Sequence, residues 1–143
     1  MTQQPVEGAI IAPVPKSAMS GNRAVIALLD KAQTDNESGQ REAAGASLER
    51  ALRIERRNPW LWLELAQVRL DQGLYAQAIT LAGKSNSFAG HQPRVQAANW
   101  RVIGHARVAQ GDAAGAGQAF KLAAEFAQQA KAEADHDSGF NLK

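Results

Sequence analysis

The sequence contains no cysteine, few aromatic residues and very little net charge. Without cysteine the chain can form no disulfide, no thiolate metal site and no cysteine nucleophile. Sixteen basic residues stand against fourteen acidic ones, and a formal charge of +2 gives no positive field suited to nucleic acid. No apolar run reaches membrane-spanning length, and no secretory signal is present. We therefore expect no nucleic-acid partner, no metal and no cofactor.

Alanine and leucine supply most of the apolar content, which is 45% of the chain. Valine, isoleucine and threonine, which favour strands, are sparse and never alternate regularly with polar residues. Alanine and leucine are strong helix formers, and alanine also lets helices approach closely. A chain of 143 residues has room for one domain. The composition thus predicts a single all-α domain.

The two ends of the chain differ in composition from its middle. Pro5, Pro13 and Pro15 lie near the start, and proline lacks an amide donor and disfavours helix in the residue before it. We predict a flexible proline-containing linker over residues 1–20, a folded domain over 21–134 and a disordered tail over 135–143.

The middle of the chain repeats itself, with units at residues 25–58, 59–92 and 97–130. The first step is 34 residues, the period of the tetratricopeptide repeat (TPR), and the second is 38. About four extra residues therefore lie in the stretch 87–93. The units match at position 4 (Leu28, Trp62, Trp100), position 8 (Ala32, Ala66, Gly104), position 15 (Gly39, Gly73, Gly111), position 20 (Ala44, Ala78, Ala116) and position 27 (Ala51, Ser85, Ala123).

These matched positions predict helix-turn-helix units. Small residues at positions 8 and 20 let two helices cross closely, and glycine at position 15 ends the first helix at positive φ. We predict helices at about 21–37, 41–56, 59–72, 75–87, 93–110 and 112–134, with Asp112 as the N-cap of the last. The predicted fold is three tandem TPR repeats in a short right-handed solenoid, closed by an extended C-terminal capping helix.

Two positions depart from the TPR pattern. Position 11, usually aromatic, holds Asp35, Arg69 and Arg107. The proline expected at position 32 is absent, and Arg56 stands there in the first unit. These departures bear on how the units pack against each other and leave the repeat assignment intact.

The sequence offers little support for catalysis. His91, His105 and His136 lie in different predicted elements, whereas a zinc site needs three or four converging donors. The glycine-rich stretch 111–117 lacks the lysine and hydroxyl residue of a phosphate loop. We expect no enzyme; an active site assembled across repeats would need an acid–base pair near Glu64 or His105, and no spacing indicates one.

Binding is therefore the expected activity. In a TPR stack, the first helix of each unit lines a concave groove. Trp60 is informative there, because Trp62 already serves the core and aromatic residues often anchor interfaces. The alternative is that Trp60 packs beneath the linker or the preceding turn. The predicted protein-binding groove consists of Trp60, Leu63, Gln67, Leu70, Arg101 and His105.

Four stretches carry a resemblance to a known family: NRAVIALLDKA (22–32), ASLERALRIERRNPWLWLELAQVRLDQGLYAQA (46–78), GKSNSFAG (83–90) and NWRVIGHARVAQGDAAGA (99–116). They resemble bacterial TPR lipoproteins of the outer membrane that activate class A penicillin-binding proteins, the LpoP type. The resemblance covers roughly residues 20–125, and in that group the Ser85-Asn86 pair recurs.

The resemblance implies an interaction module that activates a bifunctional peptidoglycan synthase in cell-wall synthesis. It also implies a periplasmic location, with attachment to the outer membrane only through a lipid anchor that this sequence lacks. We expect a monomer, because the long final helix covers the end of the stack. The alternative function is a general TPR adaptor or assembly factor for secretion or pilus machinery.

Overall fold

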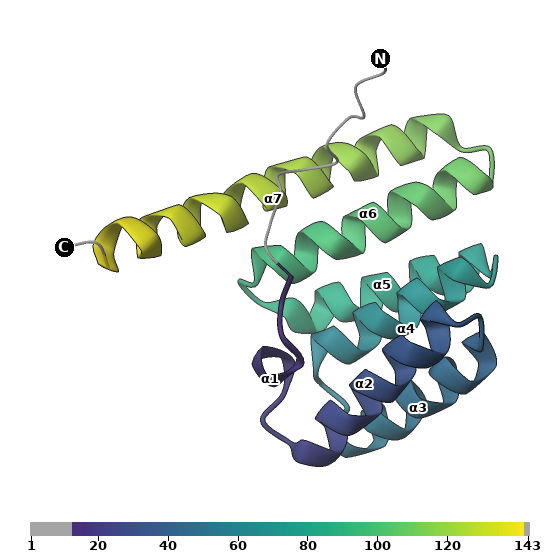
Figure 1. Ribbon diagram of the computed structural model, residues 1–143. Coiled ribbons are helices and arrows are strands. Elements are labelled where there is room, and N and C mark those ends of the chain that lie inside the picture. Colours follow the sequence, from purple (N-terminus) through teal and green to yellow (C-terminus); the bar gives the residue numbers. More distant parts are fainter. Residues whose placement is uncertain (1–12, 142–143) are drawn as a thin grey trace.

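The computed structural model describes residues 13–141, and all regular structure in that range is helical. Helices α2 to α7 form three consecutive helix-turn-helix pairs, and a short helix, α1, precedes them (Figure 1). The predicted all-α fold with three units is therefore confirmed. The helices are α1 (Lys16–Met19), α2 (Arg23–Glu37), α3 (Arg41–Ile54), α4 (Pro59–Asp71), α5 (Tyr75–Ala89), α6 (Pro93–Ala109) and α7 (Ala113–Asn141).

The turn inside each pair has the same backbone geometry. Gly39, Gly73 and Gly111 have φ angles of 87°, 78° and 80°, a region that side chains with a Cβ rarely adopt. After the third of these turns, Asp112 Oδ1 accepts a hydrogen bond from Gly115 N at 2.9 Å, as predicted for an N-cap. The repeated glycine thus sets the direction in which each second helix returns along the first.

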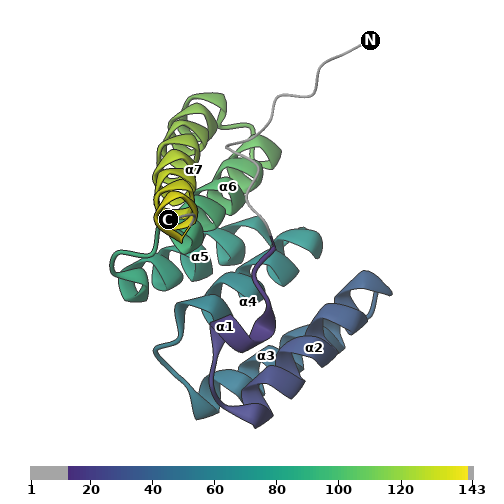
Figure 2. The ribbon, with the colours of Figure 1, turned by 60° about the vertical axis from the view of Figure 1, so that its left-hand side comes forward.

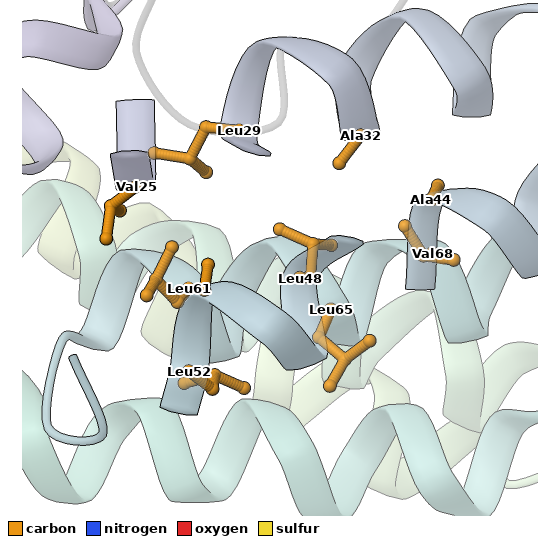
Figure 3. Packing of buried hydrophobic residues seen from close by; sticks show 10 residues of the cluster. Val25, Leu29, Ala32, Ala44, Leu48, Leu52, Leu61, Leu65 and Val68 are labelled. Atoms are coloured by element: carbon orange, nitrogen blue, oxygen red, sulfur yellow. The ribbon is translucent and has the colours of Figure 1, made fainter. Parts of the chain in front are cut away.

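Two clusters of buried side chains lie on either side of α4. The first joins α2, α3 and α4 (Figure 3), and the second joins α4 to α5, α6 and α7. Ala44 and Ala78, both at position 20, are fully buried, so the helices of these pairs cross at close range. The first cluster contains Val25, Leu29, Ala32, Ala44, Leu48, Ala51, Leu52, Leu61, Leu65 and Val68.

A buried polar network joins the second unit to the third. Asn99 Nδ2 donates to Ser85 Oγ at 2.7 Å and to Asn86 Oδ1 at 2.9 Å. Ser85 Oγ in turn donates to the backbone oxygen of Pro59 at 2.8 Å. The network links α4, α5 and α6, and gives the Ser85-Asn86 pair a structural task.

At position 11, where an aromatic residue is usual, the second and third units have arginine. In the second unit the arginine side chain covers a glycine. The guanidinium of Arg69 sits over Gly45, where a Cβ would lie 2.8 Å from Arg69 Nη1. Arg69 donates to Gln72 Oε1 at 2.8 Å and to Glu49 Oε2 at 3.3 Å. In the third unit, Arg107 Nη1 donates to the backbone oxygen of Gly115 at 3.1 Å. Arg69 therefore joins α4 to α3, and Arg107 joins α6 to α7.

The end of the predicted linker is structured. Residues 16–19 form α1, and Ser20 Oγ donates to the Glu55 carboxylate at 2.8 and 3.0 Å. Asn58 Nδ2 donates to the backbone oxygen of Met19 at 2.8 Å. The prediction of a flexible linker is thus wrong for residues 16–20, because residues 16–19 are helical and Met19 and Ser20 bond to the α3–α4 turn. Residues 1–12 of that linker lie outside the described residues.

The third pair is longer than the others at one end. Helix α6 starts at Pro93, four residues before position 1 of the third unit. The extra residues predicted in the stretch 87–93 therefore add a helical turn at the start of α6. Helix α7 continues to Asn141, so the prediction of a disordered tail from residue 135 is wrong for 135–141. Helices α6 and α7 lie side by side (Figure 2), and Figure 1 shows that α7 extends past the start of α6.

Candidate protein-binding surface

One face of α4 carries Trp60, Glu64, Gln67 and Asp71. Their spacings of four, three and four residues place them in one stripe along the helix. Asp71 also receives a hydrogen bond from α2, because Asn36 Nδ2 donates to its Oδ2 at 2.9 Å. Gln67 Nε2 donates to the other oxygen of Asp71 at 3.0 Å. This stripe and the matching faces of α2 and α6 form one side of the solenoid. We call that side the inner surface.

Trp60 lies at one end of the inner surface, partly exposed. It lines a hollow of about 370 Å³ with the first turn of α6 and the last turns of α7. Its other side packs against the second core cluster. Among the described residues, Trp60 donates no side-chain hydrogen bond, whereas Trp62 Nε1 donates to the backbone oxygen of Arg56 at 2.8 Å. The hollow is lined by Trp60, His91, Gln92, Pro93, Arg94, Ala130, Glu133, Ala134 and Asp137.

The two predicted leucines lie inward of this surface. Leu63 is only 6% exposed and belongs to the second core cluster. Leu70 is half-buried and packs against the same cluster. Position 5 of the unit therefore faces the neighbouring helix here, so Leu63 supports the surface from below and presents almost no area to a partner.

The predicted residues of α6 remain accessible to different degrees. Arg101 is half-buried, and its Nε atom is buried without a hydrogen-bond partner. His105 is exposed, and its ring makes a T-shaped contact with the Phe120 ring at a centroid distance of 5.0 Å. Neither residue lines the hollow beside Trp60. Of the predicted groove residues, Trp60 and Gln67 therefore lie on the α4 stripe, and Arg101 and His105 lie on α6, outside the hollow.

Glu64 is an inner-surface residue that the predicted groove did not include. Its carboxyl lies between Trp60 and Gln67 on the α4 stripe, partly buried. Burial raises the pKa of Glu64 above its ordinary value, and the positive charge of Lys16 in α1 opposes that rise. Helix α1 therefore brings a cation towards the inner surface. The signal available in the sequence was the four-residue spacing from Trp60.

The described residues include no metal-binding cluster and no membrane-spanning helix. Within them, no group of three histidine, cysteine, aspartate or glutamate residues could hold a metal ion. None of the helices found in residues 13–141 is long and apolar enough to cross a membrane.

Comparison with known proteins agrees with the repeat geometry. The family model of the tetratricopeptide repeat matches residues 35–99, which run from the end of α2 to the first half of α6. A comparison with curated protein sequences found no match. The match locates tetratricopeptide repeats in this part of the chain, and such repeats indicate protein–protein interaction.

A solved structure extends the comparison to a larger part of the chain. The globular C-terminal domain of LpoP from P. aeruginosa superposes on this chain with a TM-score of 0.70 and 46% sequence identity. The aligned region covers 71% of this chain and 96% of that LpoP domain. The chain belongs to the LpoP family. Its α2–α7 solenoid is accordingly the TPR domain of an LpoP-type protein, and the resemblance noted in the sequence is confirmed.

Proposed function

We propose that this domain activates a class A penicillin-binding protein, a bifunctional peptidoglycan synthase, by binding it. The observation that carries the proposal is the 46% identity to the LpoP domain over 96% of that domain's length. The TPR match supports a protein partner in general. On this proposal the domain has no catalytic chemistry of its own, and activation comes from a shift of the synthase towards its active conformation, which requires tighter binding to that conformation.

We place the synthase contact on the inner surface. Trp60 supplies a partly exposed aromatic ring with an indole N–H free to donate to a partner. Gln67, Arg101 and His105 supply polar groups at intervals along the same surface. Aromatic and arginine side chains in partly buried positions are the residues that most often dominate binding energy. Leu63 and Leu70 hold this surface in place from within the core.

The family resemblance also supports a location for the protein. An LpoP-type activator would be attached to the outer membrane through a lipid anchor and would face the periplasm. The chain described here binds as a monomer on this proposal, because α7 packs along α6 and closes the end of the stack.

The test is binding of the domain to the purified periplasmic part of a class A penicillin-binding protein from the same bacterium. We expect saturable binding and faster glycan polymerisation or crosslinking. Trp60→Ala should weaken binding by more than about tenfold, roughly 1.4 kcal/mol. His105→Ala tests an exposed residue that does not lie in the core, and Arg50→Ala, exposed on α3, is the matched control that should leave affinity unchanged.

The possible outcomes separate the partner from the surface. Binding that Trp60→Ala and His105→Ala leave untouched would keep the synthase as partner and refute the inner surface as its site. No binding and no change in synthase activity at saturating protein would refute the activator function. A TPR adaptor for secretion or pilus machinery would then be the better description.

A further inference from the structure

The opposite side of the solenoid carries a groove between α3 and α5, with α4 as its floor. Two adjoining hollows of about 350 and 280 Å³ share Glu49 as a common wall. Leu65 and Leu81 contribute to the first hollow, and Trp62 and Phe88 to the second. Along α5 the groove runs from Ala76 to Phe88, about 18 Å at 1.5 Å per residue. We call it the outer groove.

Cations and aromatic rings meet at one end of the outer groove. The Trp62 and Phe88 rings lie 6.4 Å apart between centroids. Lys84 Nζ lies 5.7 Å from the Trp62 centroid and 5.4 Å from the Phe88 centroid, so its charge is held over both rings. Arg53 and Arg56 line the same hollow from the α3 side and are exposed.

These cations have no carboxylate partner among the described residues. Glu49 pairs with Arg69 at 3.3 Å. Glu55 accepts hydrogen bonds from Ser20 and Asn58 on another side of the turn. Of the two acids that lie close to the arginines at positions 50, 53, 56 and 57 in the sequence, Glu49 is thus paired with Arg69 within the groove wall and Glu55 is bonded on the other side of the turn. Arg53, Arg56 and Lys84 leave this end of the outer groove positively charged.

We propose that the outer groove is a second docking surface, which binds an acidic amphipathic segment of a partner protein. An apolar floor flanked by unpaired cations complements a segment whose apolar side chains enter the groove while carboxylates meet Arg53, Arg56 and Lys84. The length of about 18 Å accommodates roughly twelve helical residues. A groove with raised walls suits an inserted segment better than a flat lipid surface. This surface is separate from the inner surface and does not depend on the synthase being the partner.

A pair of synthetic peptides tests the proposal on the intact chain. Each has twelve residues with leucine and tryptophan at helical spacing, and the flanking positions are all glutamate in one and all lysine in the other. We expect the acidic peptide to shift the amide NMR signals of residues 49–56 and 76–88, with an affinity that falls as salt is added. The basic peptide should produce no such shifts.

Charge reversal identifies the residues responsible. Arg53→Glu combined with Lys84→Glu should weaken binding of the acidic peptide at least tenfold at low salt. Arg50→Glu combined with Lys121→Glu changes the net charge equally at exposed positions outside the outer groove, and should leave the affinity within about twofold. Circular dichroism of both double variants checks that the fold is retained.

Several results would overturn the proposal. These are equal binding of the two peptides, shifts confined to other helices, no shifts at all, or equal losses in the two double variants. Shifts of the same residues by anionic lipid vesicles in place of the acidic peptide would assign the cations to a membrane surface, and would also overturn it.

Discussion

Ser85 and Asn99 meet in the interior with both side chains fully buried, and Asn99 Nδ2 donates to Ser85 Oγ at 2.7 Å. Ser85 Oγ in turn donates a hydrogen bond to the backbone oxygen of Pro59, the first residue of α4. A buried polar group costs free energy unless it is paired, so this contact fixes how the third unit sits on the second. The rest of this interface is lined mainly by alanine and valine, whose apolar contacts are not directional, whereas the hydrogen bonds are.

We expect Ser85→Ala to lower the free energy of unfolding by about 1–3 kcal/mol, because buried groups on two neighbouring helices lose a partner. Urea denaturation measures the change. Ser87→Ala is the control, since Ser87 is exposed and its hydroxyl bonds only to Lys84 O in the same helix. It should change stability by less than about 0.5 kcal/mol. Equal effects of the two substitutions would contradict the role of the network.

Gly104 and Gly83 should respond to alanine with opposite signs. A Cβ at residue 104 would lie 2.6 Å from Cε1 of Phe120, so Gly104→Ala overpacks the α6–α7 contact and should cost about 1–3 kcal/mol. A Cβ at residue 83, inside α5, would meet no atom within 4 Å. Gly83→Ala should therefore stabilise the protein by roughly 0.5–1 kcal/mol. Thermal unfolding of both variants checks the prediction.

Glu64 should make stability depend on pH. Burial raises the pKa of Glu64 in the folded state above its ordinary value of 4.5. Between the unfolded and folded pKa values the folded state binds more protons, so stability falls as pH rises through that window. Glu64→Gln should therefore raise the unfolding midpoint more at pH 7 than at pH 4. An equal gain at both pH values would refute a buried carboxylate as the cause.

The anchor of α1 can be tested separately from the stability of the domain. Glu55→Ala removes the acceptor of the Ser20 hydroxyl, so residues 16–20 should exchange their amide hydrogens faster and trypsin should cleave faster after Lys16. Glu42→Ala, at an exposed position on α3, is the control. Unchanged exchange in the Glu55 variant would show that other contacts hold α1.

The parts of the fold that follow from local rules could be predicted from the sequence. Glycine at position 15 and small residues at positions 8 and 20 fix the turns and the close crossings, and Gly39, Gly73 and Gly111 all have positive φ. The six long helices follow, with boundaries within two residues everywhere except at the end of α7. These features depend on one residue type at one position.

Features that depend on distant contacts were missed. Helix α1 has four residues and no strong signal of its own, and it forms where Ser20 and Met19 bond to residues 35 and 39 positions away. Leu63 is at a groove position by the repeat rule, yet it is buried because position 5 faces the neighbouring helix in this stack. The outer groove could not be predicted either. In the sequence Glu49 and Glu55 lie close to several arginines, and only the fold shows that Glu49 pairs with Arg69 and that Glu55 bonds to Ser20.

The attachment of residues 19–20 to the α3–α4 turn has a mechanical consequence. Tension applied to the N-terminal side of the domain reaches Ser20 and Met19 first, and their bonds to Glu55 and Asn58 carry that load into the middle of the solenoid. Helix α2 lies beyond this point in the chain, so it is shielded from being peeled away one turn at a time. Pulling the protein from residue 13 in a single-molecule instrument should therefore require a higher force than pulling the Glu55→Ala variant.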